Sequence, residues 1–335
     1  MTYKQRAARN MLRYVRQADK AADDFAKQYA RAAALISSMD VARYDALTNA
    51  EADALVTEYT GGNLFKFLQK SAKKFPRLAV MLQSPTIRTE CKRLERAFLQ
   101  VSQALDLQLD LHVLNGITEE AYYRQAFEID RRTAVHDFWR ITPEEITAIV
   151  YLLWARDRQT IPQRIRNNNR YRVLQIKREI IKTAVTNRPD TAHKQAVQER
   201  CAQAAGDTRR VIRTEAARVV QAAQARAATR AGLKKYIYIA TLDEVTCKHS
   251  CARLDGLFFF YHQKIVGVNF PPMHPNCRCT TAPYITYREQ AALMRSAITA
   301  DGHPILVPAT MTYWQWYNKY IAPAQKAQKA KGGTK

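Results

Sequence analysis

Several features that would place a protein in a familiar class are scarce or missing in this sequence of 335 residues. It has only six cysteines, too few for a disulfide-dense secreted scaffold. It has no run of about 18 apolar residues, which excludes a helix that crosses a bilayer. Its amino terminus has basic residues scattered among small and polar ones without a continuous apolar stretch. We therefore expect no secretory signal and no route into an oxidising compartment.

The sequence also lacks the short motifs of several large enzyme classes. It contains no Gly-x-x-x-x-Gly-Lys-Ser/Thr loop, no Gly-x-Gly-x-x-Gly, no Gly-x-Ser-x-Gly and no His-Glu-x-x-His. Neighbouring acids such as Asp23-Asp24 and Glu119-Glu120 fit helix surfaces better than an acid/base pair. Nucleotide hydrolysis and the common hydrolase mechanisms are therefore disfavoured. We expect no small-molecule substrate and no enzymatic activity.

Acidic residues are few relative to basic ones. The chain has 53 Lys and Arg against 30 Asp and Glu, a net charge of +23. The segment from Arg131 to Lys235 alone has 23 basic and 9 acidic residues, a balance of +14. Such a patch attracts phosphates without reading sequence, so we expect non-specific contact with double-stranded DNA; the alternative is a solvated helix face. The candidate DNA-contacting residues are Arg164, Arg166, Arg170, Arg172, Arg226, Arg230 and Lys234.

Glycine and proline are sparse in the first 230 residues, which contain four of the ten glycines and five of the twelve prolines. Apolar residues recur every three or four positions across Leu12–Ile36 and Leu94–Leu109, which predicts amphipathic helices. A capping box with proline at the first helical position starts another helix at Thr142. Helical pattern continues beyond it, with turn signals at Asn187–Pro189 and Gly206-Asp207. The amino-terminal two-thirds should therefore be mostly helical.

Beyond Gly232 the pattern changes. Residues Tyr236–Ala240 are β-branched and aromatic, which is typical of a strand. A second capping box at Thr241 predicts a short helix over Leu242–Leu254, and a hairpin should follow over Leu257–Phe270. The fold class is therefore α+β, with a mostly helical amino-terminal two-thirds followed by a small α+β module of short antiparallel strands.

The densest aromatic group, Tyr313 to Tyr320, lies near the carboxy terminus. Its three tyrosines would share one helical face, which could close the core of the α+β module; a partner-binding anchor is the alternative. The last residues, 325–335, are rich in Lys, Ala and Gly. We expect them to form a basic disordered tail.

Four of the six cysteines crowd into one short stretch of the carboxy-terminal third. Two of them would lie one turn apart on the predicted helix, and a proline-rich turn then adds a histidine and two more cysteines. Thiolates and imidazole are the donors that tetrahedral zinc prefers, so a structural zinc site using four of the five is predicted. Disulfides and free buried thiols are the alternatives. The candidate zinc ligands are Cys247, Cys251, His274, Cys277 and Cys279.

The rival interpretation is a small metal-dependent nuclease. Its active site would consist of residues beside the cysteines, namely Asp243, His249, His274 and Asn276. Two arguments stand against it. The cysteines take the metal positions, and no acidic pair remains nearby to bind a catalytic divalent ion.

Several short stretches together resemble one family. Thr241–Cys247 with Cys251, then Leu254–Gly256 and Pro272–Cys279, are similar to the phage Mu F-like minor head proteins. The resemblance covers roughly residues 152–283, and a three-residue gap between Cys247 and Cys251 departs from the family's usual two. Upstream it includes Arg164-Ile165, Asn167-Asn168, Arg213-Thr214-Glu215 and Arg218.

The resemblance implies a minor virion component that acts in procapsid assembly and head morphogenesis. Such a protein would dock on the portal or the major capsid protein and contact the packaged DNA. It would be assembled in the bacterial host cytoplasm and reside in the phage head. We expect the helices over Leu12–Ile36 and Leu94–Leu109 to offer half-satisfied apolar faces for this docking.

Four segments follow from these arguments. They are a helical region (1–140), a basic helical region (141–230), the Cys/His-containing α+β head-morphogenesis module (231–324) and the basic tail (325–335).

Overall fold

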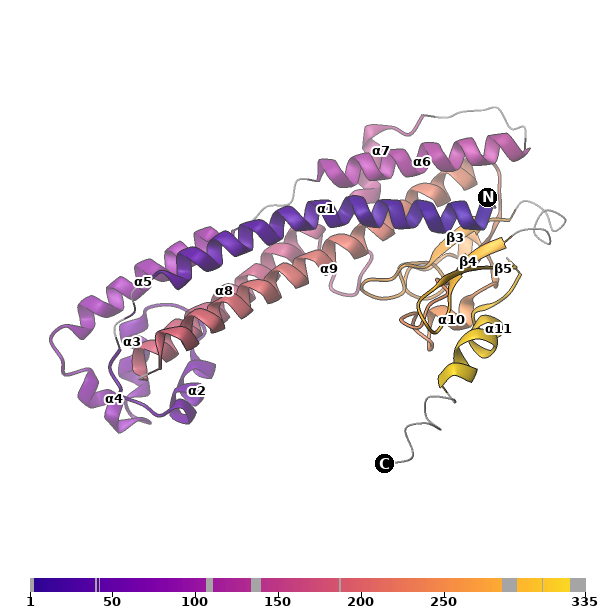
Figure 1. Cartoon of the computed structure of the whole chain (residues 1–335). Coiled ribbons are helices and arrows are strands. Elements are labelled where there is room, and N and C mark those ends of the chain that lie inside the picture. Colours follow the sequence, from indigo (N-terminus) through magenta and orange to yellow (C-terminus); the bar gives the residue numbers. More distant parts are fainter. Residues whose placement is uncertain are drawn as a thin grey trace, which may run out of the picture. The chain divides into compact units, whose positions relative to one another are not determined.

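The structure is a computed structural model that describes residues 3–39, 41, 43–106, 111–133, 140–186, 188–284, 294–308 and 310–325. These residues are mostly helical and end in a small set of antiparallel strands, which confirms the α+β prediction (Figure 1). The chain divides into two compact units. Unit 1 comprises residues 1–21, 110–160 and 210–335, and unit 2 comprises residues 22–109 and 161–209. The predicted basic tail beyond residue 325 lies outside the described residues.

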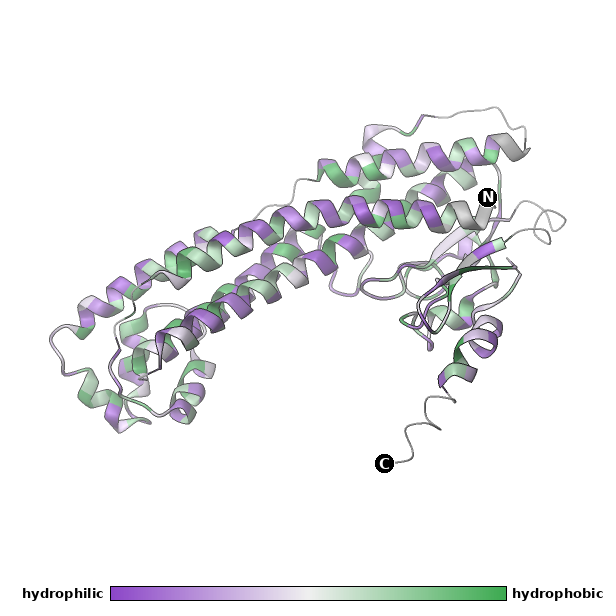
Figure 2. Ribbon diagram, viewed as in Figure 1, coloured by the Kyte–Doolittle hydropathy of each residue, from purple (hydrophilic) through white to green (hydrophobic). Residues whose placement is uncertain are grey.

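The longest helices are α1 (Tyr3–Ser37) and α9 (Asp190–Arg230), and each contributes residues to both units. Hydrophobic and hydrophilic residues alternate around α1, as Figure 2 shows. Leu12 is 48% exposed, so the buried face is offset by one residue from the predicted one at this end. Its buried positions are Met11, Tyr14, Ala18, Ala22, Phe25, Tyr29, Ala32, Ala33 and Ile36.

The second predicted amphipathic helix is α5 (Ile87–Ala104), whose apolar face from Ile87 through Leu94 to Val101 is buried. It ends before Leu109, which lies outside the described residues. The expectation that α1 and α5 leave their apolar faces half satisfied is wrong, because other parts of the same chain cover those faces. A docking argument that depends on them therefore loses its premise.

The described part of unit 2 is helical. Its α8 (Ile161–Val185) packs against α2 (Asn49–Glu58) and α5, while α3 (Leu64–Ser71) contacts α5 and α4 (Pro76–Met81). The backbone N–H groups of Tyr44, Ala46 and Leu47 donate to the last carbonyls of α8. This pairing satisfies carbonyl groups that a helix end leaves open.

The turn predicted at Gly206-Asp207 is wrong, because α9 is continuous through both residues. Asp207 is held by an ion pair with Arg172, and Thr208 is buried with its hydroxyl 2.9 Å from that of Tyr29. A glycine inside a helix costs only about 1 kcal/mol relative to alanine. These packed neighbours are sufficient to offset that cost.

Unit 1 contains the helix that the Thr142 capping box predicts. The α7 helix (Pro143–Val150) begins with the Thr142 hydroxyl accepting from the Glu145 N–H, and the Glu145 carboxylate accepting from the Thr142 N–H. It packs against α6 (His112–Thr133). The prediction is confirmed because both partners of the capping box lie within one helical turn.

A three-stranded antiparallel sheet follows α9 in the order β2-β1-β3. The central strand β1 (Lys235–Ile239) pairs with β2 (Phe258–Phe260) and with β3 (Thr280–Pro283). Tyr236 packs with buried residues of α6 and α9, and Ile237 packs on the opposite face of the strand. Because both faces of the strand are covered, its sequence is a continuous apolar run rather than an alternation of apolar and polar residues.

Two local predictions in this region are wrong. No helix spans Leu242–Leu254, because residues 241–250 form turns and α10 covers only Cys251–Leu254. The Thr241 hydroxyl, the predicted cap, donates instead to the Arg278 carbonyl, and the Thr241 carbonyl accepts from the Thr246 hydroxyl. Leu257–Phe270 is not a hairpin either: β2 pairs with β1, and the chain continues into a 3-10 turn at Tyr261–Gln263.

The carboxy-terminal hairpin joins β4 (Met294–Ile298) to β5 (Pro304–Pro308). After it come α11 (Tyr313–Trp316) and a π-helical turn, Tyr317–Ile321. Tyr313 and Trp316 are fully buried in a core that includes Leu242, Ala252, Ala297 and Val307. Of the three tyrosines expected to close this core, Tyr313 is buried in it, and Tyr317 and Tyr320 are partly buried against it.

Candidate metal centre and basic surfaces

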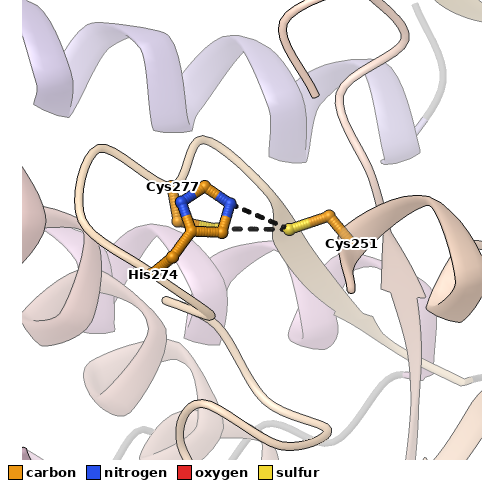
Figure 3. A group of neighbouring side chains, drawn as sticks. All are labelled: Cys251, His274 and Cys277. Atoms are coloured by element: carbon orange, nitrogen blue, oxygen red, sulfur yellow. Dashed lines mark hydrogen bonds between the residues drawn. The ribbon is translucent and has the colours of Figure 1, made fainter. Parts of the chain in front are cut away.

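A cluster of two cysteines and one histidine lies in unit 1. Cys251 is the first residue of α10, and His274 and Cys277 belong to the turn that leads into β3. The Cys251 Sγ atom is 3.3 Å from His274 Nε2 and 3.9 Å from Cys277 Sγ (Figure 3). One donor atom from each residue lies within 4.8 Å of the other two. We call these three residues the Cys/His triad.

The other two predicted ligands flank the Cys/His triad. The Cys247 sulfur is half-buried and accepts a hydrogen bond from the Ser250 hydroxyl at 3.1 Å. Cys279 is buried in the same cluster as Tyr238, Ala240 and the triad cysteines. All six cysteines of the chain are free thiols in this structure.

Electrostatics within the triad favour a charged pair. Hydrogen bonds from the thiols of Cys277 and Cys279 hold the pKa of Cys251 well below its usual range. The hydrogen bond to Cys251 raises the pKa of His274 to about 9. Without a metal, these shifts favour the thiolate of Cys251, the form of cysteine that binds metal, and the imidazolium of His274, which would have to release its proton to become a ligand.

Neighbouring elements fix the turn that contains His274 and Cys277. The Asn276 N–H donates to the Thr214 hydroxyl of α9 at 3.0 Å. Two turns further along α9, the Gln221 side chain donates to Thr280 and accepts from Thr281 at the start of β3. The Asn276 backbone adopts φ +59°, a left-handed conformation that asparagine tolerates better than most residues. The ligand turn is thus tied to a long helix on one side and to the sheet on the other.

The triad and its supports fall within a single family match. Residues 175–282 match the family model described as phage Mu protein F like protein. This region is phage Mu F-like. It runs from the second half of α8 through α9 and β1 to β3, so it contains the Cys/His triad and confirms the resemblance carried by the motifs. Comparison with curated proteins and with solved structures found no match.

The F-like region contains a buried ion pair that sequence reasoning singled out only as part of the family pattern. Arg218 and Glu215, both on α9, have side chains that are 1% exposed, with 2.6 Å between Arg218 Nε and Glu215 Oε2. Arg218 also donates to the carbonyls of Ile149 and Val150 at the end of α7. The Trp154 indole N–H donates to Glu215 at 3.0 Å.

A second buried pair explains the Leu254–Gly256 motif. The Asp255 carboxylate accepts from the Arg295 guanidinium at 2.9 Å and from the backbone N–H groups of Ala240 and Tyr313. It therefore joins the end of β1, the β4–β5 hairpin and α11. Arg295 was missed by sequence reasoning because it lies 40 residues away in sequence and follows a segment with no recognisable motif.

The residues of the nuclease hypothesis differ in their burial and contacts. Asp243 is buried and bound to Arg278 through both carboxylate oxygens. His249 and Asn276 are exposed, whereas His274 is part of the Cys/His triad. The contacts of Asp243 are those of a residue that holds two loops together.

The basic residues predicted to contact DNA are divided between the units. Arg226 and Arg230 share Glu145 in unit 1, and Arg230 also donates to the Tyr122 hydroxyl. Lys234 is exposed. The remaining four predicted residues, Arg164, Arg166, Arg170 and Arg172, lie on α8 of unit 2.

On α8, exposure separates these residues. Arg172 is paired with Asp207 and its side chain is 16% exposed, while Arg164 is partly buried. Arg166 and Arg170 are exposed.

Within the described ranges, no helix is both long and apolar enough to cross a membrane.

Proposed function

We propose that the protein is a minor head component of a phage, which joins the head during procapsid assembly and remains in the virion. The observation that carries this proposal is the F-like match over residues 175–282. The structure adds that this stretch forms a helix-supported sheet with a buried ion pair and a core cluster of its own. A rigid module of this kind can keep a docking surface intact on the portal or the major capsid protein.

The test is incorporation into particles. Phage produced from a genome with an epitope-tagged copy of the gene should contain the protein in gradient-purified virions and proheads, at a few copies relative to the major capsid protein. Disruption of the gene should reduce the yield of filled heads. Absence of the tagged protein from both kinds of particle, at unchanged phage yield, would contradict the proposal.

We further propose that the Cys/His triad binds a structural zinc ion. Two sulfurs and one imidazole nitrogen within 4.8 Å of one another form a donor set that zinc prefers. Tetrahedral coordination needs a fourth ligand, and Cys247 and Cys279 flank the triad. The metal would link α10 to the turn before β3. The role is structural, since no step of chemistry is needed to account for these residues.

The surroundings of the triad fit a thiolate-bound metal. The Tyr238 hydroxyl is buried against the cluster and has no hydrogen-bond partner among the described residues. A thiolate bound to zinc remains a hydrogen-bond acceptor, so Tyr238 could donate to it as an outer-shell partner. Protein purified under reducing conditions should contain about one zinc per chain.

Chelation should lower the melting temperature of unit 1, because metal binding and folding are coupled. Cys251→Ser and Cys277→Ser should remove most of the zinc, whereas Cys91→Ser, a buried thiol on α5, is the matched control. Comparison of Cys247→Ser with Cys279→Ser identifies the fourth ligand. A metal-free preparation with an unchanged melting curve would refute the zinc site.

Contact with double-stranded DNA is the remaining part of the proposal. The net charge of +23 and the exposed cations Arg166, Arg170 and Lys234 support it. Arg226 and Arg230 are weaker candidates, because they share the Glu145 carboxylate. Duplex binding should weaken steeply as salt rises, with a slope set by the number of phosphates neutralised. Binding that does not depend on salt would refute it.

A further inference from the structure

Unit 2 has a pocket of about 780 Å³ on one side of α8. The loop after α2 and the end of α5 complete its wall, through residues such as Gly61 and Ser102. A pocket of this size falls within the range of sites that hold small ligands. Besides Tyr171, the residues that α8 contributes recur at three- and four-residue steps and so share one helical face: Arg166, Asn169, Arg170, Val173, Leu174 and Lys177.

The basic residues in this pocket differ from those elsewhere on α8. Outside the pocket, three basic residues of α8 have partners within the chain. Arg172 pairs with Asp207, and Lys182 pairs with Asp53. Arg178 donates hydrogen bonds to the carbonyls of Thr57 and Tyr59. Inside it, Arg166, Arg170 and Lys177 form no ion pair with any described residue.

Lys177 is partly buried, with its Nζ atom 5.7 Å from the centre of the Phe98 ring, and burial lowers its pKa. Asp106 is the single acid among the described lining residues. The pocket therefore concentrates positive charge that the protein itself does not neutralise.

Asn169 provides an independent observation. It lines the pocket, is only 5% exposed, and its Oδ1 atom accepts from the Tyr29 hydroxyl. Its Nδ2 donor is buried and has no hydrogen-bond partner among the described residues. Buried amide donors are almost always paired, so an unpaired one beside a pocket calls for an acceptor from outside the chain.

We propose that this pocket is an anion site that binds phosphate groups through Arg166, Arg170 and Lys177, with the Asn169 amide as a neutral donor. Every one of these groups donates hydrogen bonds, and guanidinium groups match the oxygens of phosphate in pairs. The phosphates could belong to a free phosphorylated molecule or to the backbone of nucleic acid. The proposal does not depend on a role in head assembly, and it gives the DNA contact proposed above a defined location if the source is nucleic acid.

The experiment is calorimetric titration of the full chain with sodium tripolyphosphate at low salt. The Arg166→Gln/Arg170→Gln variant is compared with Lys92→Gln/Arg96→Gln, which removes the same charge from exposed positions of α5 in the same unit. Wild type should bind one tripolyphosphate per chain. The pocket variant should lose at least about tenfold in affinity, since charge-assisted hydrogen bonds are the strongest of their kind, and the control should change less than about twofold. Circular dichroism verifies that all variants are folded.

A parallel titration with a short DNA duplex distinguishes the two sources. Displacement of the duplex by tripolyphosphate, with both ligands weakened by the pocket variant, identifies the DNA backbone as the source. Loss of tripolyphosphate binding with unchanged duplex binding identifies a free phosphorylated ligand. No binding by wild type, or equal loss in the pocket variant and the control, overturns the proposal. Neither result bears on incorporation into particles, so failure here and failure of the head-protein assignment remain distinguishable.

Discussion

The buried pair between Arg218 and Glu215 gives the sharpest prediction about what holds unit 1 together. Both side chains are 1% exposed. Arg218→Met keeps much of the volume but removes the guanidinium that pairs with the buried Glu215 carboxylate. Removal of one partner from a buried pair costs about 3–5 kcal/mol in the free energy of unfolding. The Val150 carbonyl also loses the Arg218 donor, whereas the Ile149 carbonyl still accepts from the Leu152 N–H.

The double variant Arg218→Met/Glu215→Leu tests the cause. It removes both charges, and hydrophobic replacements of a buried pair are often neutral or stabilising. The Val150 carbonyl remains without the guanidinium, and an unsatisfied buried group costs about 1–3 kcal/mol. We therefore expect the double variant to be more stable than Arg218→Met alone. Such non-additivity is what a double-mutant cycle measures.

The assay is denaturant unfolding followed by tryptophan fluorescence. All four tryptophans of the chain fall within the sequence ranges of unit 1, so their emission follows that unit. Arg226→Met on the same helix is the control, because its side chain is 49% exposed and exposed pairs contribute at most about 1 kcal/mol. The reasoning is refuted if Arg218→Met costs no more than the control, or if the double variant is the least stable of the set.

Two further predictions concern buried titratable groups. Burial lowers the pKa of His193, so the free energy of unfolding should fall as pH decreases through about 6.5, where the unfolded chain takes up a proton that the folded chain does not; urea unfolding followed by circular dichroism should show this loss in wild type and a flatter profile in His193→Asn, and identical profiles would contradict it. Burial also raises the pKa of Cys91 and of Cys201 to about 11. In metal-free protein, iodoacetamide at about pH 8 should therefore modify the half-buried Cys247 well before either of them, as peptide mass spectrometry can establish; equal rates would show that the two buried thiols are accessible.

Local sequence signals were sufficient for the features that depend on near neighbours. The capping box at Thr142 starts α7 because its hydrogen bonds close within one turn. The helical spacing of Tyr313, Tyr317 and Tyr320 places these residues against the core, since it needs only the periodicity of their own segment, but it does not reveal the buried Trp316. The apolar run at β1 is read correctly for the same reason.

Long-range contacts decided the rest. The capping box at Thr241 does not start a helix, because the Thr241 hydroxyl donates to the Arg278 carbonyl and the Thr241 carbonyl accepts from the Thr246 hydroxyl. Strand β2 pairs with β1 rather than with the residues that follow it. The four segments divided by sequence are consecutive, whereas the compact units are discontinuous, since α1 and α9 each supply residues to both. Neither the composition nor the residue spacing indicates which distant segments of the chain come into contact.

The sequence by itself determined which donor atoms are available for a metal: four cysteines and a histidine in one stretch, with the residue types that zinc prefers. Only the tertiary structure decided that Cys251, His274 and Cys277 come together while Cys247 and Cys279 flank them. It also decided that Arg166 and Arg170 line a pocket while Arg172 is paired. The physical reason is that side-chain chemistry is a property of each residue, whereas proximity and burial depend on contacts between segments far apart in the chain.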